Sequence, residues 1–375
     1  MTSRPRKPTN FIAEWFGHRV YPIVADSAAA RQDQQQRHCP FLTQATKSTT
    51  ECVKAEHSKG VCTISSTSNG LRQDWLVCPF RALDGDLLDN AARRLFGHGN
   101  SMDINLVPVS VLGREGRATE FRDAVRSNVP SLVYFQSKLG GEISIGATSR
   151  SPEFSFDATM VEILPSGLSN GLRLGRYGIF EIQTMDFHGT YRAATSNLVN
   201  ALHLHRDDFS QAIGDHPSWL AERVEGPNIA NVFKRTFYQM MFKFQIGDHG
   251  KSAGCIFAIP RSVWDSWQRH LGAPELLEHG DGTWRLKSEQ HDLADKPPAW
   301  IYVFDVNESG AETPNRLQLW RVIGTSAEAL AYYALDVAPR AALEEGGSVD
   351  RLLASAKARL LPYLPELVNE DADLL

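Results

Sequence analysis

Residues 176–187 read RYGIFEIQTMDF, an apolar run into which one carboxylate and one amide are inserted. Side chains alternate between the two faces of a β-strand, so Glu181 and Gln183 lie on one face and Ile182 on the other. Burying an ionised side chain costs free energy unless an opposite charge or a metal ion compensates it. The stretch therefore predicts a core strand whose two polar side chains bind a compensating charge or metal ion between them.

Further β-rich runs on both sides of this stretch predict that it belongs to a sheet. Gly, Pro and Ser separate the runs, which cover residues 131–136, 142–146, 152–164, 177–185, 255–259, 300–306 and 316–324. Apolar residues at helical spacing predict helices over residues 10–24, 80–97, 117–127, 190–205, 227–246, 262–271, 325–337 and 349–361. This order predicts an α/β (α+β) protein with a mixed central sheet flanked by helices.

The composition is that of a globular protein with a sizeable core. The chain has 375 residues, of which 42% are hydrophobic and 22% charged. No stretch approaches the roughly 20 apolar residues of a membrane span, and the basic start MTSRPRKPTN lacks the apolar segment of a secretory signal. We therefore expect a cytoplasmic protein with no membrane partner. The net charge of −5 argues against indiscriminate coating of nucleic acid but allows a DNA enzyme with a positive cleft.

Four of the five cysteines, Cys39, Cys52, Cys62 and Cys78, are clustered in a segment that is poor in apolar residues. Such a segment could hardly build a core alone. Because cytoplasmic thiols stay reduced, the cluster indicates a metal site, with disulfides and unpaired thiols as the alternatives. Four thiolates fill the tetrahedral coordination of Zn²⁺ or a single Fe and leave no position for water, so the expected role is structural.

A second candidate site consists of carboxylates. Asp157 ends the run PEFSFD, and if this strand pairs with the next, Asp157 and Glu181 meet at one edge. Two converging carboxylates repel unless a cation lies between them, and Mg²⁺ in such a site promotes phosphodiester hydrolysis. Glu142, in KLGGEISI, is a further carboxylate nearby. The alternative is structural: Asp157 accepts hydrogen bonds from turn amides, and Glu181 pairs with an arginine such as Arg176.

The spacing of these acids resembles the PD-(D/E)xK nuclease core, with Pro152 displaced and Gln183 in the place of the lysine. Longer stretches resemble more specifically the NotI-like family of type II restriction endonucleases. They are NFIAEWFGHRVYP, the four cysteine loops, FQSKLGGEISI, SPEFSFD, RYGIFEIQTMDFHGTY, EGPNIANVFKRTFYQM and FAIPRSVWDSWQRHL. The resemblance runs from about residue 10 to about residue 345 and weakens over residues 98–130, 160–175 and 195–222.

The resemblance implies a homodimeric, Mg²⁺-dependent, type II site-specific deoxyribonuclease that cuts double-stranded DNA. Its target would be a GC-rich palindrome with a central GGCC, with GCGGCCGC favoured and CGGCCG as the competitor. Asp157 and Glu181 would bind Mg²⁺, Gln183 would replace the lysine, and Glu142 would assist. The four clustered cysteines would hold iron, where the residues alone favour zinc. A cognate DNA methyltransferase would act in the same restriction-modification system.

These inferences give a domain plan and a set of DNA contacts. We expect a flexible basic tail over residues 1–9, an N-terminal helix and four-cysteine module over 10–90, an endonuclease domain over 91–362 and an acidic tail over 363–375. Reading guanine edges requires Arg or Lys, and the candidates are Lys138, Arg192, Lys234 and Arg235. The alternative for Lys234 and Arg235 is a solvated helix face. The alternative function is a metal-stapled, sequence-specific DNA-binding protein without cleavage activity.

Overall fold

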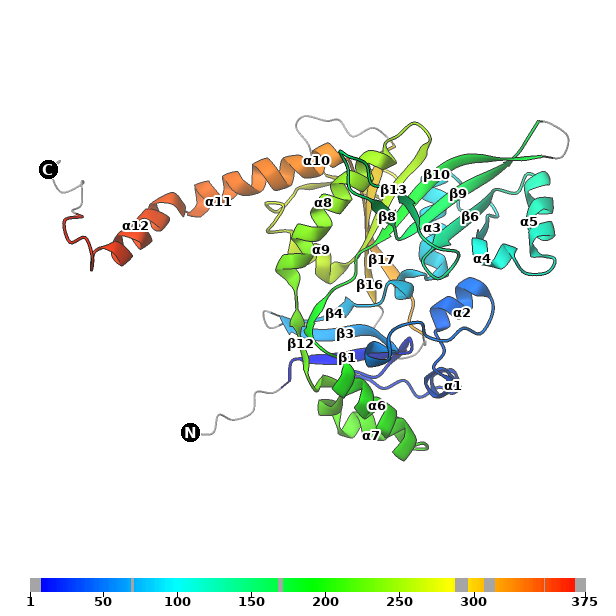
Figure 1. Cartoon of the computed structure of the whole chain (residues 1–375), viewed down its shortest axis with the longest axis horizontal. Helices are drawn as coiled ribbons and strands as arrows, with labels where there is room; N and C mark the ends of the chain where they lie inside the picture. Colours follow the sequence, from blue (N-terminus) through cyan, green and yellow to red (C-terminus); the bar gives the residue numbers. More distant parts are fainter. Residues whose placement is uncertain are drawn as a thin grey trace.

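The centre of the structure, a computed structural model, is a large mixed sheet (Figure 1). The structure describes residues 8–68, 71–167, 171–286, 296–306, 314–346 and 348–367. Within these ranges the sheet has nine strands, in the order β14-β15-β17-β16-β13-β10-β9-β6-β5. Along this order the strands are Leu276–Glu278, Trp284–Leu286, Leu317–Thr325, Ala299–Val306, Ser252–Pro260, Leu172–Ile182, Ala158–Pro165, Ser131–Gln136 and Asn105–Pro108. The predicted mixed sheet flanked by helices is confirmed at this level.

Strand β10, which carries the sequence FEI, lies inside this sheet. It pairs antiparallel with β9, with Phe180 opposite Ala158, and parallel with β13, with Glu181 opposite Phe257. A parallel pair requires a long crossover connection. The crossover from β10 to β13 contains the helices α6 (Arg192–Leu204), α7 (Phe209–Asp215) and α8 (Ile229–Gly247).

Helices cover both faces of the sheet at β10. Helix α3 (Gly85–Phe96) packs on one face together with Phe180 and Ile182. Helices α8 and α9 (Arg261–Trp267) pack on the other face, where Ile179 belongs to their apolar core. The approach of α3 is close, because a Cβ atom at Gly178 would lie 2.9 Å from Leu95. The predicted alternation along FEIQ is confirmed, and Glu181 points to the α8 side.

The helix predicted over residues 10–24 is wrong, because this segment forms β1 (Asn10–Trp15) and β2 (His18–Arg19). Both strands belong to a second sheet, in the order β2-β1-β3-β4, with β3 (Val61–Ser68) and β4 (Leu71–Leu76). Residues 12–15 are all buried, so β1 is covered on both faces. A short strand that is buried on both faces has no period-two pattern and cannot be distinguished from a buried helix by sequence.

The second sheet has an apolar core of its own, although the cysteine segment was expected to lack one. The missing apolar surface comes from later in the chain, from α6, α7, the 3₁₀ turn η3 (Pro217–Ala221) and β12 (Val224–Pro227). Figure 1 shows α6 and α7 beside β1. A hydrogen bond also joins β1 to β12: Asn10 Nδ2 donates to the carbonyl of Val224 at 3.3 Å.

The remaining elements complete the two units. They are α1 (Ala28–Gln36), α2 (Pro40–Thr46), η1 (Glu56–Ser58), η2 (Pro79–Ala82), α4 (Val109–Leu112), α5 (Arg117–Arg126), β7 (Ile143–Ile145), β8 (Phe154–Phe156), β11 (Phe187–Gly189), α10 (Ala327–Tyr332), the π-helical turn η4 (Tyr333–Val337), α11 (Ala338–Gly346) and α12 (Ser348–Leu360). The expected domain boundary at residue 90 falls inside α3. Of the expected tails, residues 1–7 and 368–375 lie outside the described residues.

No helix among the described residues is long and apolar enough to cross a membrane.

A buried ion pair joins the second sheet to the rest of the molecule. Glu14 on β1 and Arg81 in η2 are both fully buried, and Arg81 Nε donates to Glu14 Oε2 at 3.0 Å. Thr63 donates to the same oxygen at 2.5 Å, and Arg81 also donates to the carbonyl of Asn315. Burial alone would raise the pKa of Glu14, but the charges of Arg81 and Arg19, together with the hydrogen bonds from Arg81 and Thr63, outweigh burial and lower it. Glu14 is therefore an anion stabilised by its partners.

We predict that Arg81→Met destabilises the protein by about 3–5 kcal/mol at pH 7, because it leaves Glu14 buried without its partner. Urea unfolding measures the change. Since the folded-state pKa of Glu14 is lowered, the stabilisation exists above the unfolded pKa of about 4.3 and is lost as the pH falls through the folded pKa. The control is Arg316→Met, which removes an exposed partner of Asp86 and should cost less than about 1 kcal/mol. Equal costs would contradict a buried, paired Glu14.

Candidate active site

Asp157 and Glu181 lie side by side at the end of β10. Asp157 Oδ2 accepts a hydrogen bond from the backbone N–H of Ile182 at 2.9 Å. Glu181 Oε1 accepts one from the backbone N–H of Asp157 at 3.1 Å. The bonds are reciprocal because the strands are antiparallel and Phe180 pairs with Ala158, which places Glu181, the residue after Phe180, beside Asp157, the residue before Ala158. The sheet thus brings the two predicted acids together.

Glu142 approaches the same point from a short hairpin. Strand β7 pairs with β8 so that Ile143 lies opposite Phe156, and the next pair in this register is Glu142 and Asp157. Glu142 is exposed. Partial burial and the Asp157 carboxylate raise its pKa, while Lys243 opposes the shift. The three predicted acids therefore interact electrostatically at one edge of the sheet.

Lys243 on α8 is the partner of Glu181, and no motif points to it. Its Nζ donates to Glu181 Oε2, and both side chains are buried. The suggested pairing of Glu181 with Arg176 is wrong, because the Arg176 guanidinium donates to the carbonyl of Phe96. One signal was present in the sequence: Lys243 falls on the helix face that buries Thr236, Met240 and Phe244. A lysine on the buried face of a helix needs a buried acid.

Glu181 lies in an environment that opposes its negative charge. Burial raises its pKa well above the usual range, and the neighbouring Asp157 carboxylate adds to the increase. The Lys243 ammonium lowers the pKa and offsets part of this effect. A carboxylate pair of this kind attracts cations, and its hard oxygen donors suit a divalent ion such as Mg²⁺.

Gln183 follows β10 directly and is also held by α8. Its Oε1 accepts a hydrogen bond from the buried Thr236 hydroxyl at 2.6 Å, and its Nε2 donates to the carbonyl of Thr184. A primary amide has two N–H groups and two lone pairs, so Gln183 can also hydrogen-bond a water or a phosphate oxygen. Helix α8 thus holds both Glu181 and Gln183.

The four clustered cysteines are free thiols that influence one another. Cys39, Cys62 and Cys78 are buried in one apolar core, and Cys52 packs against it. The hydrogen bond from Cys62 lowers the pKa of Cys78 to about 6 against the effect of burial, and the Lys54 ammonium assists. Burial raises the pKa of Cys39 to about 12. The donors are those of a Zn²⁺ or Fe site.

Neither site is a preformed metal cage. In the ranges that the structure describes, no group of three or more His, Cys, Asp or Glu side chains is arranged to hold a metal ion. Metal binding would therefore require the thiols, or the carboxylates, to close around the ion. For the thiols, this closure would also release protons, because burial raises the pKa of Cys39 and the hydrogen bond with Cys78, together with burial, raises the pKa of Cys62.

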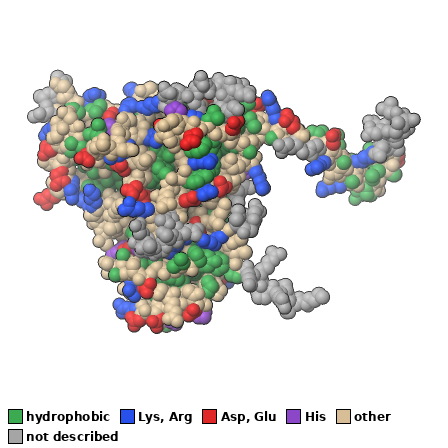
Figure 2. All heavy atoms as spheres, turned by 180° about the vertical axis from the view of Figure 1, so that it is seen from behind, with side chains coloured by type: hydrophobic (Ala, Val, Ile, Leu, Met, Phe, Trp, Pro, Cys, Tyr) green, Lys and Arg blue, Asp and Glu red, His purple; other side chains and the backbone are tan. Residues whose placement is uncertain are grey.

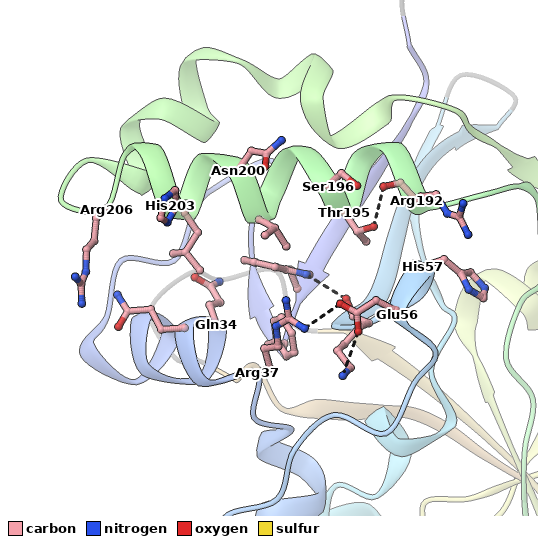
Figure 3. Close-up of a pocket in the computed structure, with 16 residues that line it drawn as sticks. Gln34, Arg37, Glu56, His57, Arg192, Thr195, Ser196, Asn200, His203 and Arg206 are labelled. Atoms are coloured by element: carbon pink, nitrogen blue, oxygen red, sulfur yellow. Dashed lines mark hydrogen bonds and ion pairs between the residues drawn. The ribbon is translucent and has the colours of Figure 1, made fainter.

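The four candidate DNA contacts are all exposed, but they lie on different elements. Lys138 follows β6 in the loop that leads to Glu142, and Lys234 and Arg235 lie on α8, where Arg235 pairs with Asp186 at 3.1 Å. Arg192 begins α6 and borders a cavity of about 680 Å³ between α1, η1 and α6 (Figure 3).

This cavity is strongly cationic. Its described lining includes Arg37, Lys59, Arg192 and Arg206, with Glu56 as the one acid. Glu56 is already paired with Arg37 at 2.9 Å and with Lys59 at 3.4 Å. Figure 3 shows α6 contributing further polar groups to the cavity, among them Ser196, Asn200 and His203. The excess of positive charge around this cavity favours the binding of a polyanion.

The sequence matches no protein-family model, and a search of curated proteins finds no significant relative.

We predict that Glu181 and Lys243 are energetically coupled. Lys243→Met should lower the free energy of unfolding by about 3–5 kcal/mol, because it leaves the buried Glu181 without its partner. The double variant Glu181→Gln/Lys243→Met should cost less than the sum of the single changes, with a coupling of about 0.5–3 kcal/mol. Denaturant unfolding of the four proteins measures this. The control Lys234→Met, on the exposed side of the same helix, should change stability by no more than about 0.5 kcal/mol. If the effects of Glu181→Gln and Lys243→Met simply add in the double variant, the buried pair is ruled out.

Proposed function

We propose that the protein is a Mg²⁺-dependent type II restriction endonuclease. It would hydrolyse both strands of double-stranded DNA within a GC-rich palindrome, with GCGGCCGC favoured over CGGCCG. The observation that carries this proposal is the arrangement of Asp157, Glu181 and Lys243 at the end of β10. Two acids beside one lysine are the groups that the PD-(D/E)xK resemblance calls for, although here the lysine comes from a helix.

Each residue of the site has a separate role in the proposed reaction. Asp157 and Glu181 would hold Mg²⁺, which supplies Lewis acidity and an attacking hydroxide when bound. The Lys243 ammonium supplies the positive charge that Gln183 lacks, and it can stabilise the charge that develops on the phosphate. Gln183, fixed by Thr236, can orient a water by hydrogen bonding. Exposed Glu142 interacts electrostatically with Asp157 and can accept a proton or a hydrogen bond there.

The cationic cavity beside α6 supports DNA as the substrate. Arg37, Lys59, Arg192 and Arg206 surround it, and phosphate contacts by such residues dominate the affinity of proteins for DNA. Lys138, Lys234 and Arg235 remain candidates for base contacts. A palindromic target is read by a two-fold symmetric protein, so we propose a homodimer. In a cytoplasmic restriction-modification system, a cognate DNA methyltransferase would protect the same sequence.

The cysteine cluster would hold a structural iron or zinc ion. Cys39 and Cys78 directly precede α2 and η2, and Cys62 lies on β3, so one ion bound by them and Cys52 would tie four separated segments together. A closed four-thiolate site has no open coordination position, so the ion would contribute stability and not chemistry. It would also hold η1, and with it Lys59, beside the cationic cavity.

We predict Mg²⁺-dependent cleavage of a plasmid that carries one GCGGCCGC site, with sequencing of the ends to give the target and the stagger. A plasmid in which CGGCCG has other flanking bases distinguishes the shorter target. Asp157→Ala should lower cleavage roughly a thousandfold or more, because it removes a metal ligand. Gel shifts in Ca²⁺ should show that this variant still binds DNA, whereas Asp103→Ala, an exposed acid elsewhere, should leave cleavage unchanged.

The variants also separate the competing interpretations. Lys243→Met should lose cleavage, and Gln183→Lys/Lys243→Met, which returns a lysine to the strand position, should recover part of it. Specific binding without nicking, in Mg²⁺ and in Mn²⁺, would instead identify a DNA-binding protein without cleavage activity. Undiminished cleavage by Asp157→Ala would reject the assigned site.

We predict about one iron or zinc ion per chain in the protein purified from cells, measured by elemental analysis. The variant Cys62→Ser/Cys78→Ser should lose most of this metal and unfold at a lower temperature. Cys255→Ala removes the buried thiol outside the cluster and should retain the metal. A metal-free wild-type protein, or equal loss from Cys255→Ala, would contradict the four-cysteine site; zinc in place of iron would decide only the identity of the ion.

A further inference from the structure

The C-terminal helices form an arm that leaves the body of the protein. Helix α10 is anchored, with Ala329 and Leu330 buried and Glu328 accepting a hydrogen bond from Gln245 of α8 at 3.2 Å. Beyond η4, helices α11 and α12 run away from both sheets (Figure 1). The arm therefore lacks the covering that the other long helices receive from the sheets.

Helix α12 carries a continuous apolar stripe that faces water. Val349, Leu352, Leu353 and Leu360 are 55%, 66%, 60% and 44% exposed. Together with Ala356 they recur at spacings of three and four residues, which places them on one helix face. Figure 2 shows hydrophobic side chains gathered on the projecting arm. A patch of this kind on an amphipathic helix indicates an interface.

The length of α12 strengthens this argument. It has 13 residues, and isolated helices shorter than roughly 12–15 residues are marginal in water. Its sequence is suited to packing against a second helix, because the apolar positions follow the spacing of a coiled-coil seam. What covers the stripe must therefore contribute apolar surface of similar length.

We propose that the α12 helices of two copies of this chain pair in antiparallel orientation and so form a dimer interface. Asp350 and Lys357 are seven residues apart and flank the stripe on the same side. In an antiparallel pair, equivalent flanks of the two helices face each other, so Asp350 of each copy meets Lys357 of the other. The arrangement is self-complementary, as a two-fold interface requires, and the opposed helix dipoles also attract.

The body of the protein offers a less suitable partner. A groove of about 670 Å³ beside α8 is lined by Tyr238, Met241 and Phe242 and carries His249 and Lys251. Its described lining contains no acid, whereas α12 has three cationic side chains and one acid. The described part of the groove therefore offers no acid to pair with the cations of α12. A second α12 offers an apolar stripe of equal length and an acid, Asp350, opposite Lys357.

The interface is measured without DNA or metal, so its test does not require nuclease activity. A homodimer is also part of the proposed function, and the α12 variants are what assign the dimer contact to this helix. Sedimentation or light scattering of the full-length protein should give twice the chain mass of 41.7 kDa. Leu352→Lys/Leu353→Lys should raise the dimer dissociation constant roughly tenfold or more. The matched control, Ala354→Lys/Ala358→Lys, places the same two charges on the opposite, exposed face of α12 and should leave the dimer intact.

Charge exchange tests the orientation. Asp350→Lys and Lys357→Asp should each weaken the dimer, and the double exchange should restore it, since only the antiparallel pair brings these two positions together. A monomeric wild-type protein would overturn the proposal. Protection of the arm from proteolysis in such a monomer would indicate that the arm folds onto the groove beside α8. Dimers that survive Leu352→Lys/Leu353→Lys would place the interface elsewhere, and failure of the double exchange to restore the dimer would reject the antiparallel pairing.

Discussion

The contact between Glu181 and Lys243 is the constraint on which the candidate site depends. It places a carboxylate and an ammonium inside the protein, on the face of β10 that α8 covers. Each charge would be costly without the other. The same helix holds Gln183 through Thr236, so the position of α8 determines the direction of both polar side chains. The sheet then adds Asp157 through two backbone hydrogen bonds.

Segments far apart in the chain build the second unit. Its sheet begins with β1, yet its apolar core is completed by α6, α7 and β12, which belong to the crossover between β10 and β13. The same crossover therefore supplies α8 to the carboxylates and α6 to the cationic cavity. In the function that we propose, this one connection couples the catalytic groups to the surface that binds the DNA backbone. The buried Glu14–Arg81 pair fixes the second sheet to the rest of the molecule.

Local patterns predicted much of this fold. Strands such as β6, β13 and β16 and helices such as α5 and α8 were identifiable because their periodicity and turn residues agree with their final environment. The segment 10–24 was predicted incorrectly because its partner strand β3 lies some 50 residues away. Burial on both faces removes the alternation that marks a strand. In such segments, tertiary contacts outweigh the intrinsic preference of the residues for helix or strand.

The sequence by itself determined the polar faces of the site: the alternation in FEIQ places Glu181 and Gln183 together, and the acids at positions 142 and 157 are visible as carboxylates near strands. Only the tertiary structure decided which charge meets Glu181. Arg176 was the near neighbour in sequence, but Lys243 lies 62 residues away and reaches the strand because α8 crosses the sheet there. Sequence separation carries no information about such a contact, because helix packing on a sheet sets the distance between the two side chains.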